Sequence, residues 1–477
     1  MHHDLIFGAA WCRHCRPAPL QHPRARQGTE GDPHCDPCRP ARHFPSLSIS
    51  RGIFQDENPT GMAPRVAIVG AGVAGSFLGR ALALRGIPSK IYDAAAGPGD
   101  RLRRGLGLWP NSRKALVDVK LGEYLDSQAH FVPPAAYRAR DGSWLSGCSA
   151  RPDNLHRVAC VEQNSLLAAL AAEPCLDISW DKRVVRVEAW DGLDGKPGTR
   201  EGAVIHFEDG SSEETDLVVG CDGAQSVVRR SMFPGASVMY SGRTCLSAIV
   251  DVPPTDRPFE TLSRSVGHHH MGIRPGSPVR FAAVPLTSSH LFWFATLQAP
   301  RMLNGRPHAK GLANCLADEF SEWHKPIPEL ISAAAPDDLL CEPVYELGEP
   351  LASWSRGSAT LVGDACAPLS HNLAQSASLA IECAHALSVA LAGHEHLGAA
   401  LSQYEAGLRG RVASCRTITG FTKVLAAMPE ASGLMKFVPQ PLNGWVFDAF
   451  LDLSLSGAGT YRGPATSASC AKAGRKR

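Results

Sequence analysis

A short apolar strand, a glycine-rich loop and a helix in immediate succession constrain the fold of this chain more than any other feature. Val66-Ala67-Ile68-Val69 is a fully apolar, β-branched run, typical of a central parallel strand that is buried on both faces. The loop Gly70-Ala71-Gly72-Val73-Ala74-Gly75 follows without a gap. Apolar residues then recur at helical spacing up to Gly86, namely Phe77, Leu78, Ala81, Leu82 and Leu84.

A second strand and its terminal acid indicate what this unit binds. Ser89-Lys90-Ile91-Tyr92 completes a βαβ unit and ends at Asp93, 23 residues after Gly70, close to the ~20 residues at which an acid accepts hydrogen bonds from a ribose. Gly70 permits the turn, Gly72 lets the backbone approach a pyrophosphate, and Gly75 lets the helix pack closely. We therefore predict a dinucleotide site at residues 70–75 and Asp93, for FAD or NAD rather than NADP. A glycine turn without a ligand is the alternative.

Length and charge limit the classes of protein that remain. The 477 residues predict two or three domains, at ~150 residues each. The 48 Lys and Arg nearly cancel the 46 Asp and Glu, so we expect no nucleic-acid partner and no firm membrane signal. No uninterrupted apolar run reaches the ~18 residues that a membrane-spanning helix needs. The composition, 44% hydrophobic and 20% charged, is typical of a globular protein.

The cysteines favour a reducing compartment. Their number, 15, is odd, and most lie singly in apolar runs, which suits free thiols better than a disulfide framework. We expect no structural disulfides. The predicted location is intracellular, either cytoplasmic or, if residues 1–62 are a leader, organellar.

Residues 1–64 differ from everything that follows, because Arg, His, Pro and Cys dominate and neither structural period can be found. Cys12 and Cys15 form one CxxC pair and Cys35 and Cys38 another, an arrangement that can supply four thiolates to zinc. A leader, a disordered segment or an extension upstream of a start at Met62 is the alternative. We adopt the alternative and predict no metal site.

Two further strand-turn-helix segments follow later in the chain. Thr215–Arg229 reads as a buried strand, the turn Gly220-Cys221-Asp222-Gly223, and a helix that Ser226 caps. Ala359–Val362 is an apolar strand that leads into Gly363-Asp364 and then into a long helix through Leu391.

These segments resemble the DG and GD motifs of the class A FAD-dependent flavoprotein monooxygenases, the family of para-hydroxybenzoate hydroxylase and salicylate hydroxylase. The resemblance implies that Asp222, Gly223 and Arg229 lie beside the FAD pyrophosphate and help to bind the passing NAD(P)H. It implies that Asp364, in the segment Gly363–Pro368, accepts a hydroxyl of the FAD ribityl chain. Gly107–Asn111 and Tyr404-Glu405 with Arg409 also resemble family segments.

The chain departs from the family at two places. Ala374-Gln375-Ser376 stands where many members have Gly-Gln-Gly, whose N–H groups approach the edge of the isoalloxazine ring. Ala and Ser can still donate N–H groups. Gln163 stands where the family usually has an Arg that helps to hold FAD. Arg103 or Arg104 could contact the cofactor instead, or could form a solvated basic turn.

The implied fold class is α/β, with a Rossmann-like FAD-binding domain interleaved with a sheet-rich substrate domain and a helical C-terminal part. After the N-terminal extension, residues 65–149 form the first FAD-binding part, 150–215 a mixed region, and 216–240 the FAD-binding DG segment. Residues 241–350 form the substrate sheet, 351–463 the GD motif and C-terminal helices, and 464–477 a disordered tail.

The implied function is that of a monooxygenase. NAD(P)H would reduce FAD, and reduced FAD would react with O2 to give a C4a-hydroperoxyflavin that hydroxylates an aromatic ring or epoxidises an alkene of a small-molecule substrate. A flavin-dependent reductase or dehydrogenase on the same fold is one alternative, and a non-catalytic FAD-binding protein is another. We assign no catalytic residue. His268-His269-His270 is not a metal site, because side chains on a strand alternate between faces. The substrate's identity and the oligomeric state are open.

Overall fold

The computed structural model describes residues 63–98, 103–132, 137–146, 157–172, 176–190, 201–252, 263–268, 278–298, 310–369 and 375–427. The two CxxC pairs, His269, His270 and Ala374 lie outside the described residues, as do both predicted terminal segments apart from residues 63 and 64.

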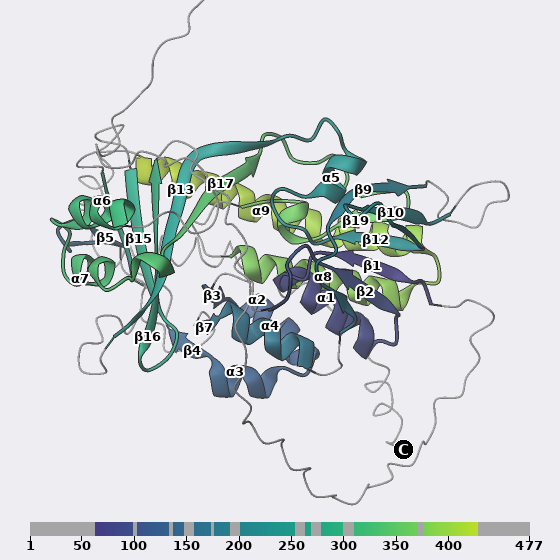
Figure 1. Cartoon of the computed structure of the whole chain (residues 1–477), viewed down its shortest axis with the longest axis horizontal. Helices are drawn as coiled ribbons and strands as arrows, with labels where there is room; N and C mark the ends of the chain where they lie inside the picture. The colour runs from purple at the N-terminus through teal and green to yellow at the C-terminus, as the bar shows by residue number, and fades with distance from the viewer. Residues whose placement is uncertain are drawn as a thin grey trace, which may run out of the picture.

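A six-stranded sheet with the order β18-β19-β12-β1-β2-β8 forms one half of the molecule (Figure 1). The predicted strand is β1 (Val66–Val69), which lies parallel to β12 (Leu217–Gly220) and β2 (Ser89–Tyr92). β19 (Ala359–Leu361) and β8 (Ile178–Ser179) extend the parallel order, and β18 (Ser355–Arg356) is antiparallel at one edge. The three predicted motifs therefore follow three adjacent strands, β1, β12 and β19, and their loops share one edge of the sheet.

Helices and a small sheet enclose this central sheet. α1 (Val73–Leu84) packs against α8 (Ser376–Gly393) and α4 (Gln163–Ala172), and α8 packs against α9 (Leu397–Ala427) and α2 (Pro110–Asp118). The smaller elements are α3 (Gly122–Gln128), α5 (Val227–Met232), β9 (Val184–Ala189), β10 (Ala203–Phe207), β11 (Ser212–Thr215) and the one-turn helix Gly363–Ala365. β9, β10 and β11 pair with one another, and Phe207 of β10 packs its ring on Tyr92 of β2, with ring centroids 5.0 Å apart.

A seven-stranded sheet forms the other half, with the order β17-β13-β16-β15-β14-β5-β6. Its strands are β13 (Val238–Asp251), β14 (Ser263–His268), β15 (Pro278–Pro285), β16 (His290–Gln298), β17 (Leu340–Leu347), β5 (Tyr137–Ala139) and β6 (Trp144–Ser146). β5 and β6 fall within residues 65–149, so this sheet draws on that segment as well. α6 (Lys310–Phe320), α7 (Ile327–Ser332) and the short helix Pro336–Asp338 lie beside the sheet, and α6 and α7 cover its outer face with a core around Trp293 and Phe320.

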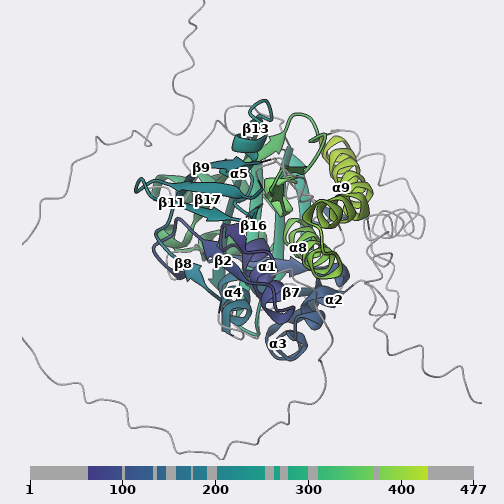
Figure 2. The same ribbon diagram turned by 90° about the vertical axis from the view of Figure 1, so that its right-hand side faces the viewer.

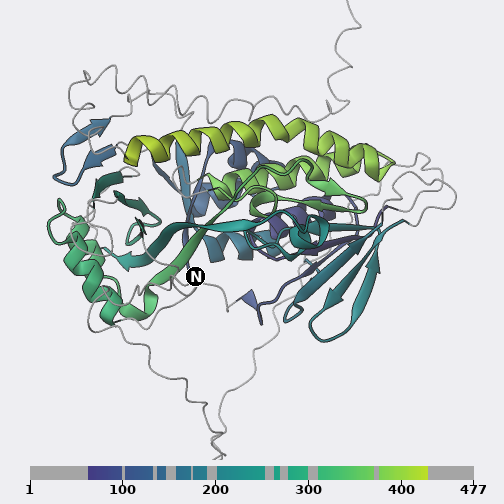
Figure 3. The same ribbon diagram turned by 90° about the horizontal axis from the view of Figure 1, so that it is seen from above.

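The inner face of the seven-stranded sheet packs on a third, small sheet of β3 (Gly105–Leu108), β7 (Val158–Glu162) and β4 (His130–Val132). The contact is close, because a Cβ built on Gly105 would lie 2.6 Å from side-chain atoms of Phe292 in β16. Figure 2 shows the helices α1, α8 and α9 stacked beside the sheets, and Figure 3 shows α9 running along the molecule over both halves. The observed mixture of a mostly parallel sheet packed against helices, a second sheet and C-terminal helices confirms the predicted fold class.

Local signals account for the helix boundaries. The Ser226 hydroxyl accepts a hydrogen bond from the Arg229 N–H at 2.9 Å, which confirms the predicted cap of α5. α1 ends before Gly86, which has a φ of +73°. α8 is long and apolar enough to span a membrane, but 61% of it is buried inside the protein, as expected of a core helix. The described cysteines are free thiols.

Candidate active site

The glycine loop after β1 has the geometry that its sequence predicted. Gly70 has a φ of +99°, which disfavours any side chain, and its N–H donates to the Tyr92 carbonyl at 2.8 Å. A Cβ built on Gly75 would lie 1.9 Å from the Gly70 carbonyl oxygen, so only glycine lets α1 begin this close to the strand. A Cβ built on Gly72, the N-cap of α1, would meet nothing within 4 Å. Open space therefore lies in front of the glycine that the prediction assigned to the pyrophosphate.

Asp93 lies against the same loop. Its Oδ2 accepts a hydrogen bond from the Ala71 N–H at 2.6 Å, and its Oδ1 accepts one from the Ala95 N–H at 2.9 Å. These bonds join the end of β2 to the glycine loop. The predicted ribose ligand is thus positioned by the backbone of the predicted pyrophosphate loop.

The DG segment after β12 is held by its own aspartate. Asp222 Oδ2 accepts hydrogen bonds from the N–H groups of Val227 at 2.6 Å and Val228 at 3.2 Å, at the start of α5. Its Oδ1 is buried and has no hydrogen-bond partner in the described part of the chain, and burial raises the pKa of this carboxyl. Gly223 has a φ of +74°, and a Cβ built on it would meet nothing within 4 Å. The buried acceptor Asp222 Oδ1 thus lies next to Gly223, whose backbone has open space in front of it.

Arg229 connects the DG and GD segments from inside the protein. Its side chain is fully buried, and its guanidinium donates to the carbonyl oxygens of Ala365, at 2.8 Å, and Ala224. Burial lowers the pKa of this guanidinium. The structure therefore places Arg229 behind the two loops, where it holds them together.

The GD segment leads from β19 to the first turn of α8. Gly363 has a φ of +65°, and a Cβ built on it would lie 3.0 Å from the Ala380 Cβ of α8 and 3.6 Å from the Ala74 Cβ of α1. Burial raises the pKa of Asp364 to about 6, although the positive charge of Arg229 opposes the shift. Pro368 is buried a few residues further on. A carboxyl group with a raised pKa thus lies beside the glycine loop, which is typical of a functional position.

The remaining predicted contacts lie around the start of β3. Arg103 forms an ion pair with Glu162 (Nε to Oε1, 2.8 Å), and Arg104 forms one with Glu342 of β17 (2.7 Å). The Gln163 N–H donates to the Arg104 carbonyl at 2.8 Å. The carboxylate partners show that neither arginine is a purely solvated basic turn, and Arg104 joins the β3 region to the seven-stranded sheet.

Gln375 and Ser376 begin α8. Gln375 is the N-cap residue and is 3% exposed; its carbonyl accepts the Leu379 N–H at 2.8 Å. Its side-chain Oε1 accepts a hydrogen bond from the Cys415 thiol of α9 at 3.6 Å. The amide side chain therefore points into the protein, and the backbone of the first turn of α8 carries the free N–H groups.

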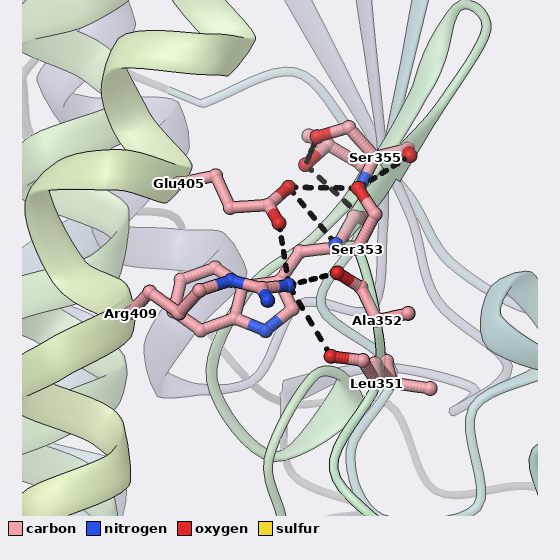
Figure 4. Close-up of polar contacts among 8 residues, drawn as sticks. Leu351, Ala352, Ser353, Ser355, Glu405 and Arg409 are labelled. Carbon is pink, nitrogen blue, oxygen red and sulfur yellow. Dashed lines mark hydrogen bonds and ion pairs between the residues drawn. The ribbon is translucent and has the colours of Figure 1, made fainter.

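Hydrogen bonds made by Glu405 and Arg409 join α9 to the segment before β18 (Figure 4). Glu405 accepts hydrogen bonds from the Ser353 hydroxyl at 2.9 Å and the Trp354 N–H at 3.0 Å. Arg409 pairs with Glu405 at 2.7 Å and donates to the Leu351 carbonyl at 3.2 Å and to the Ala352 carbonyl. The neighbouring Tyr404 donates its buried hydroxyl to the Leu361 carbonyl at 2.9 Å, at the end of β19. The three residues that resembled a family segment thus have a structural task.

Sequence reasoning missed a group of buried polar residues. Ser378 of α8 accepts a hydrogen bond from the Trp109 N–H at 3.0 Å and contacts the Ser112 hydroxyl at 3.1 Å. Glu382, one turn further along α8, accepts from Asn111 of α2 and Arg411 of α9. Trp109 and Asn111 lie in a segment that resembles the family, but no motif in the sequence points to their partners Ser378 and Glu382, which are 269 and 271 residues away along the chain.

The geometry fits FAD on three counts. The open space in front of Gly72 and Gly223 leaves room where backbone must approach a ligand. The buried Asp222 Oδ1 is a hydrogen-bond acceptor without a partner among the described residues, so a donor on a ligand fits there. The N–H groups at the start of α1 favour an anion such as a pyrophosphate. Among the described residues, no group of three or more His, Cys, Asp or Glu could hold a metal ion.

These features define a flavin-binding fold whose cofactor loops lie at one edge of a mostly parallel sheet. A family model described as the FAD binding domain matches residues 64–320. The chain belongs to this family, the class A FAD-dependent monooxygenases, and is an oxidoreductase with FAD as cofactor and NAD(P)H as the typical co-substrate of the family.

Named relatives agree with this assignment. The chain is 29% identical over 346 residues to the aurachin C monooxygenase/isomerase of Stigmatella aurantiaca, covering 72% of this chain and 84% of the relative. It is 26% identical over 340 residues to 6-hydroxynicotinate 3-monooxygenase of Bordetella bronchiseptica, covering 68% and 82%. The solved structure of Klebsiella pneumoniae HpxO with FAD and uric acid has a TM-score of 0.67, 22% identity, and coverage of 81% of this chain and 97% of that one. The predicted monooxygenase function is therefore confirmed at the level of the family.

Proposed function

We propose that this enzyme hydroxylates a planar, electron-rich aromatic ring that lies on the inner face of the seven-stranded sheet. The observation that carries the proposal is the side-chain pattern of that face. Strand pairing places Thr296 between Cys245 and Arg280 in one row, and Phe294 between Ser247 and Ala282 in the next. The row that contains the Thr296 hydroxyl and the Arg280 guanidinium thus borders the row that contains the Phe294 ring.

The row of Thr296 and Arg280 includes a hydroxyl that lacks a partner. Thr296 is 7% exposed, and its Oγ1 has no hydrogen-bond partner in the described part of the chain. Leaving a buried hydroxyl unpaired costs free energy that a bound ligand can recover. We assign Thr296 and Arg280 to a polar group of the substrate, and Phe294 to its ring face.

The relatives support a ring as the substrate. Their names specify 6-hydroxynicotinate and urate, and HpxO was crystallised with uric acid. A plant relative, the zeaxanthin epoxidase of Nicotiana plumbaginifolia, is 30% identical over 191 residues, but these cover only 40% of this chain. The zeaxanthin epoxidase of Oryza sativa, however, is 27% identical over 341 residues and matches 69% of this chain. Coverage by relatives does not separate hydroxylation from epoxidation, so the proposal of a ring rests on the side chains of the inner face.

The protein itself would hold the cofactor, orient the substrate and exclude water. Bound FAD supplies the chemistry that takes electrons from NAD(P)H and activates O2. The Gly70–Gly75 loop and the start of α1 would hold the pyrophosphate, Asp93 a ribose, and Asp364 a ribityl hydroxyl. The seven-stranded sheet would roof the reacting ring and keep water out, because water diverts activated oxygen to side products.

A direct assay tests the proposal. The purified chain would be loaded with FAD, reduced by NADH or NADPH without oxygen, and then exposed to 18O-labelled O2 with a panel of hydroxypyridines, hydroxybenzoates and purines, and with carotenoids as the alkene arm. We expect ring substrates to accelerate NAD(P)H oxidation and to gain one labelled oxygen. Labelled product from the alkenes alone would overturn the proposal, as would NAD(P)H oxidation that yields only hydrogen peroxide with every ring compound.

A further inference from the structure

A chain of five buried polar side chains lies behind the first turn of α8, and we call it the α8 network. Asn111 Nδ2 donates to Glu382 Oε2 at 2.8 Å, and Arg411 Nε donates to the same oxygen at 3.3 Å. Arg411 Nη1 donates to the Cys415 Sγ at 3.1 Å, and the Cys415 thiol donates to Gln375 Oε1 at 3.6 Å. The five residues, between 0% and 8% exposed, join α2, α8 and α9.

The network ends at the cofactor side of the protein. Gln375 is the N-cap residue of α8. The first turns of this helix lie against both the GD segment and α1, because a Cβ built on Gly363 would lie 3.0 Å from Ala380 and 3.6 Å from Ala74. The free N–H groups at the start of a helix carry partial positive charge. Whatever fixes Gln375 therefore fixes a positive helix end beside the proposed FAD site.

The network also contains a buried ion pair. The side chains of Arg411 and Glu382 are only 3% and 10% exposed, so salt and water screen their charges weakly. The two opposite charges cancel, so the pair carries no net charge. Replacing either partner with a neutral residue leaves one net charge of known sign inside the protein, close to the first turn of α8.

We propose that the α8 network is a positioning device for the flavin: it holds the start of α8 in place, and its neutral ion pair sets the reduction potential of bound FAD. This inference rests on the proposed use of the site for FAD. Reduction of a flavin by two electrons with uptake of one proton leaves one negative charge on its ring system, so nearby positive charge favours the reduced form and nearby negative charge opposes it.

The test measures the reduction potential of bound FAD at pH 8 by anaerobic titration against a reference dye. Glu382→Gln should leave Arg411 unbalanced and favour reduced FAD about tenfold, which for a two-electron couple is a rise of about 30 mV. Arg411→Gln should leave Glu382 unbalanced and lower the potential by a similar amount. The double variant should return close to the parent value.

A second pair of variants tests the positioning link while both charges of the ion pair are kept, although Cys415 also accepts a hydrogen bond from Arg411. Cys415→Ala removes the contact to Gln375 and should weaken FAD binding about tenfold and change the fine structure of the flavin absorption spectrum. Cys415→Ser keeps a donor and should restore both. This pair decides the proposal if the Arg411 variant does not fold.

Glu405→Gln is the matched control, because Glu405 is a carboxylate paired with an arginine on the same helix but faces the segment before β18 (Figure 4). It should lower the melting temperature and leave the potential unchanged. If FAD binds but the Glu382 and Arg411 variants shift the potential in the same direction, or not at all, the network is only structural and the inference is wrong. Failure of the parent chain to bind FAD would overturn the proposed function, and this inference with it.

Discussion

The six-stranded and seven-stranded sheets are built for different kinds of ligand. In the first, the proposed contacts come from loops that follow parallel strands, and many of the contacting atoms belong to the backbone at Gly72 and Gly223. In the second, the proposed contacts are side chains in the middle of antiparallel strands, such as Phe294 and Thr296. A backbone contact restricts the residue to glycine, whereas a side-chain contact leaves the choice open. The difference explains why only the first sheet carries recognisable motifs.

The largest expected effect separates two glycines of one loop. Gly75→Ala should destabilise the protein without FAD by about 3 kcal/mol or more, because the new Cβ would lie 1.9 Å from the Gly70 carbonyl. Gly72→Ala should cost at most about 1 kcal/mol, as an alanine N-cap. Its FAD affinity should nevertheless fall about tenfold, since the methyl group takes the ligand's space. Urea unfolding and FAD titration check both. Normal FAD binding by the Gly72 variant would contradict the assignment.

A pH titration probes the other cofactor loop. Burial raises the pKa of Asp364 from 3.8 to about 6, so the folded chain holds a proton there that the unfolded chain has lost between pH 4 and 6. This group's contribution to stability therefore falls as pH rises to 6 and then levels off. FAD affinity should change in the opposite sense, weakening up to tenfold per unit as pH drops below about 6, because only the ionised carboxyl is acceptor-only.

Asp364→Asn gives the matched comparison. Without FAD, this variant should be more stable than the parent at pH 7, since the amide has no charge to desolvate. Its FAD affinity should be lower at pH 7 and flat between pH 5 and 8. Fluorescence quenching of added FAD measures the affinity, and a parent profile without a step near pH 6 would remove Asp364 from the cofactor contacts.

A smaller effect tests how firmly the two sheets are coupled. Arg104 and Glu342 are 32% and 19% exposed and join the β3 region to β17. A double-mutant cycle with Arg104→Gln and Glu342→Gln should give a coupling energy of about 1 kcal/mol by urea unfolding. The pair Arg103 and Glu162, which is 53% and 29% exposed, should give less than about 0.5 kcal/mol. Equal values would mean that the Arg104 pair is no more than a surface contact.

The smallest effect on stability is expected in the seven-stranded sheet. Thr296→Val removes a buried hydroxyl that has no hydrogen-bond partner among the described residues, so stability should change by about 0.5 kcal/mol or less, or improve. FAD affinity should stay the same, while the KM for the ring substrate should rise. Serine at this position should restore the hydroxyl and lower KM again. An unchanged KM in the valine variant would move the substrate's polar group elsewhere on the sheet.

Much of the first sheet could be predicted from the chain alone. The strand Val66–Val69, the turn at Gly70 and the cap at Ser226 each depend on local rules of burial, φ and hydrogen bonding, and all three are confirmed. Local rules hold here because each motif satisfies its backbone within a few residues. The same reasoning placed Asp93 beside the loop but could not show that the Ala71 N–H occupies one of its acceptor positions.

Other features were decided only by the tertiary structure. Arg229 resembled a cofactor contact, but the packing of two distant loops buries it between the carbonyls of Ala224 and Ala365. The α8 network brings Asn111 to Glu382 across most of the chain, and its members have no shared spacing that a sequence could reveal. The physical reason is one of range: glycine turns and caps follow from φ and near-neighbour hydrogen bonds, whereas a buried charge or hydroxyl finds its partner only when separate elements pack together.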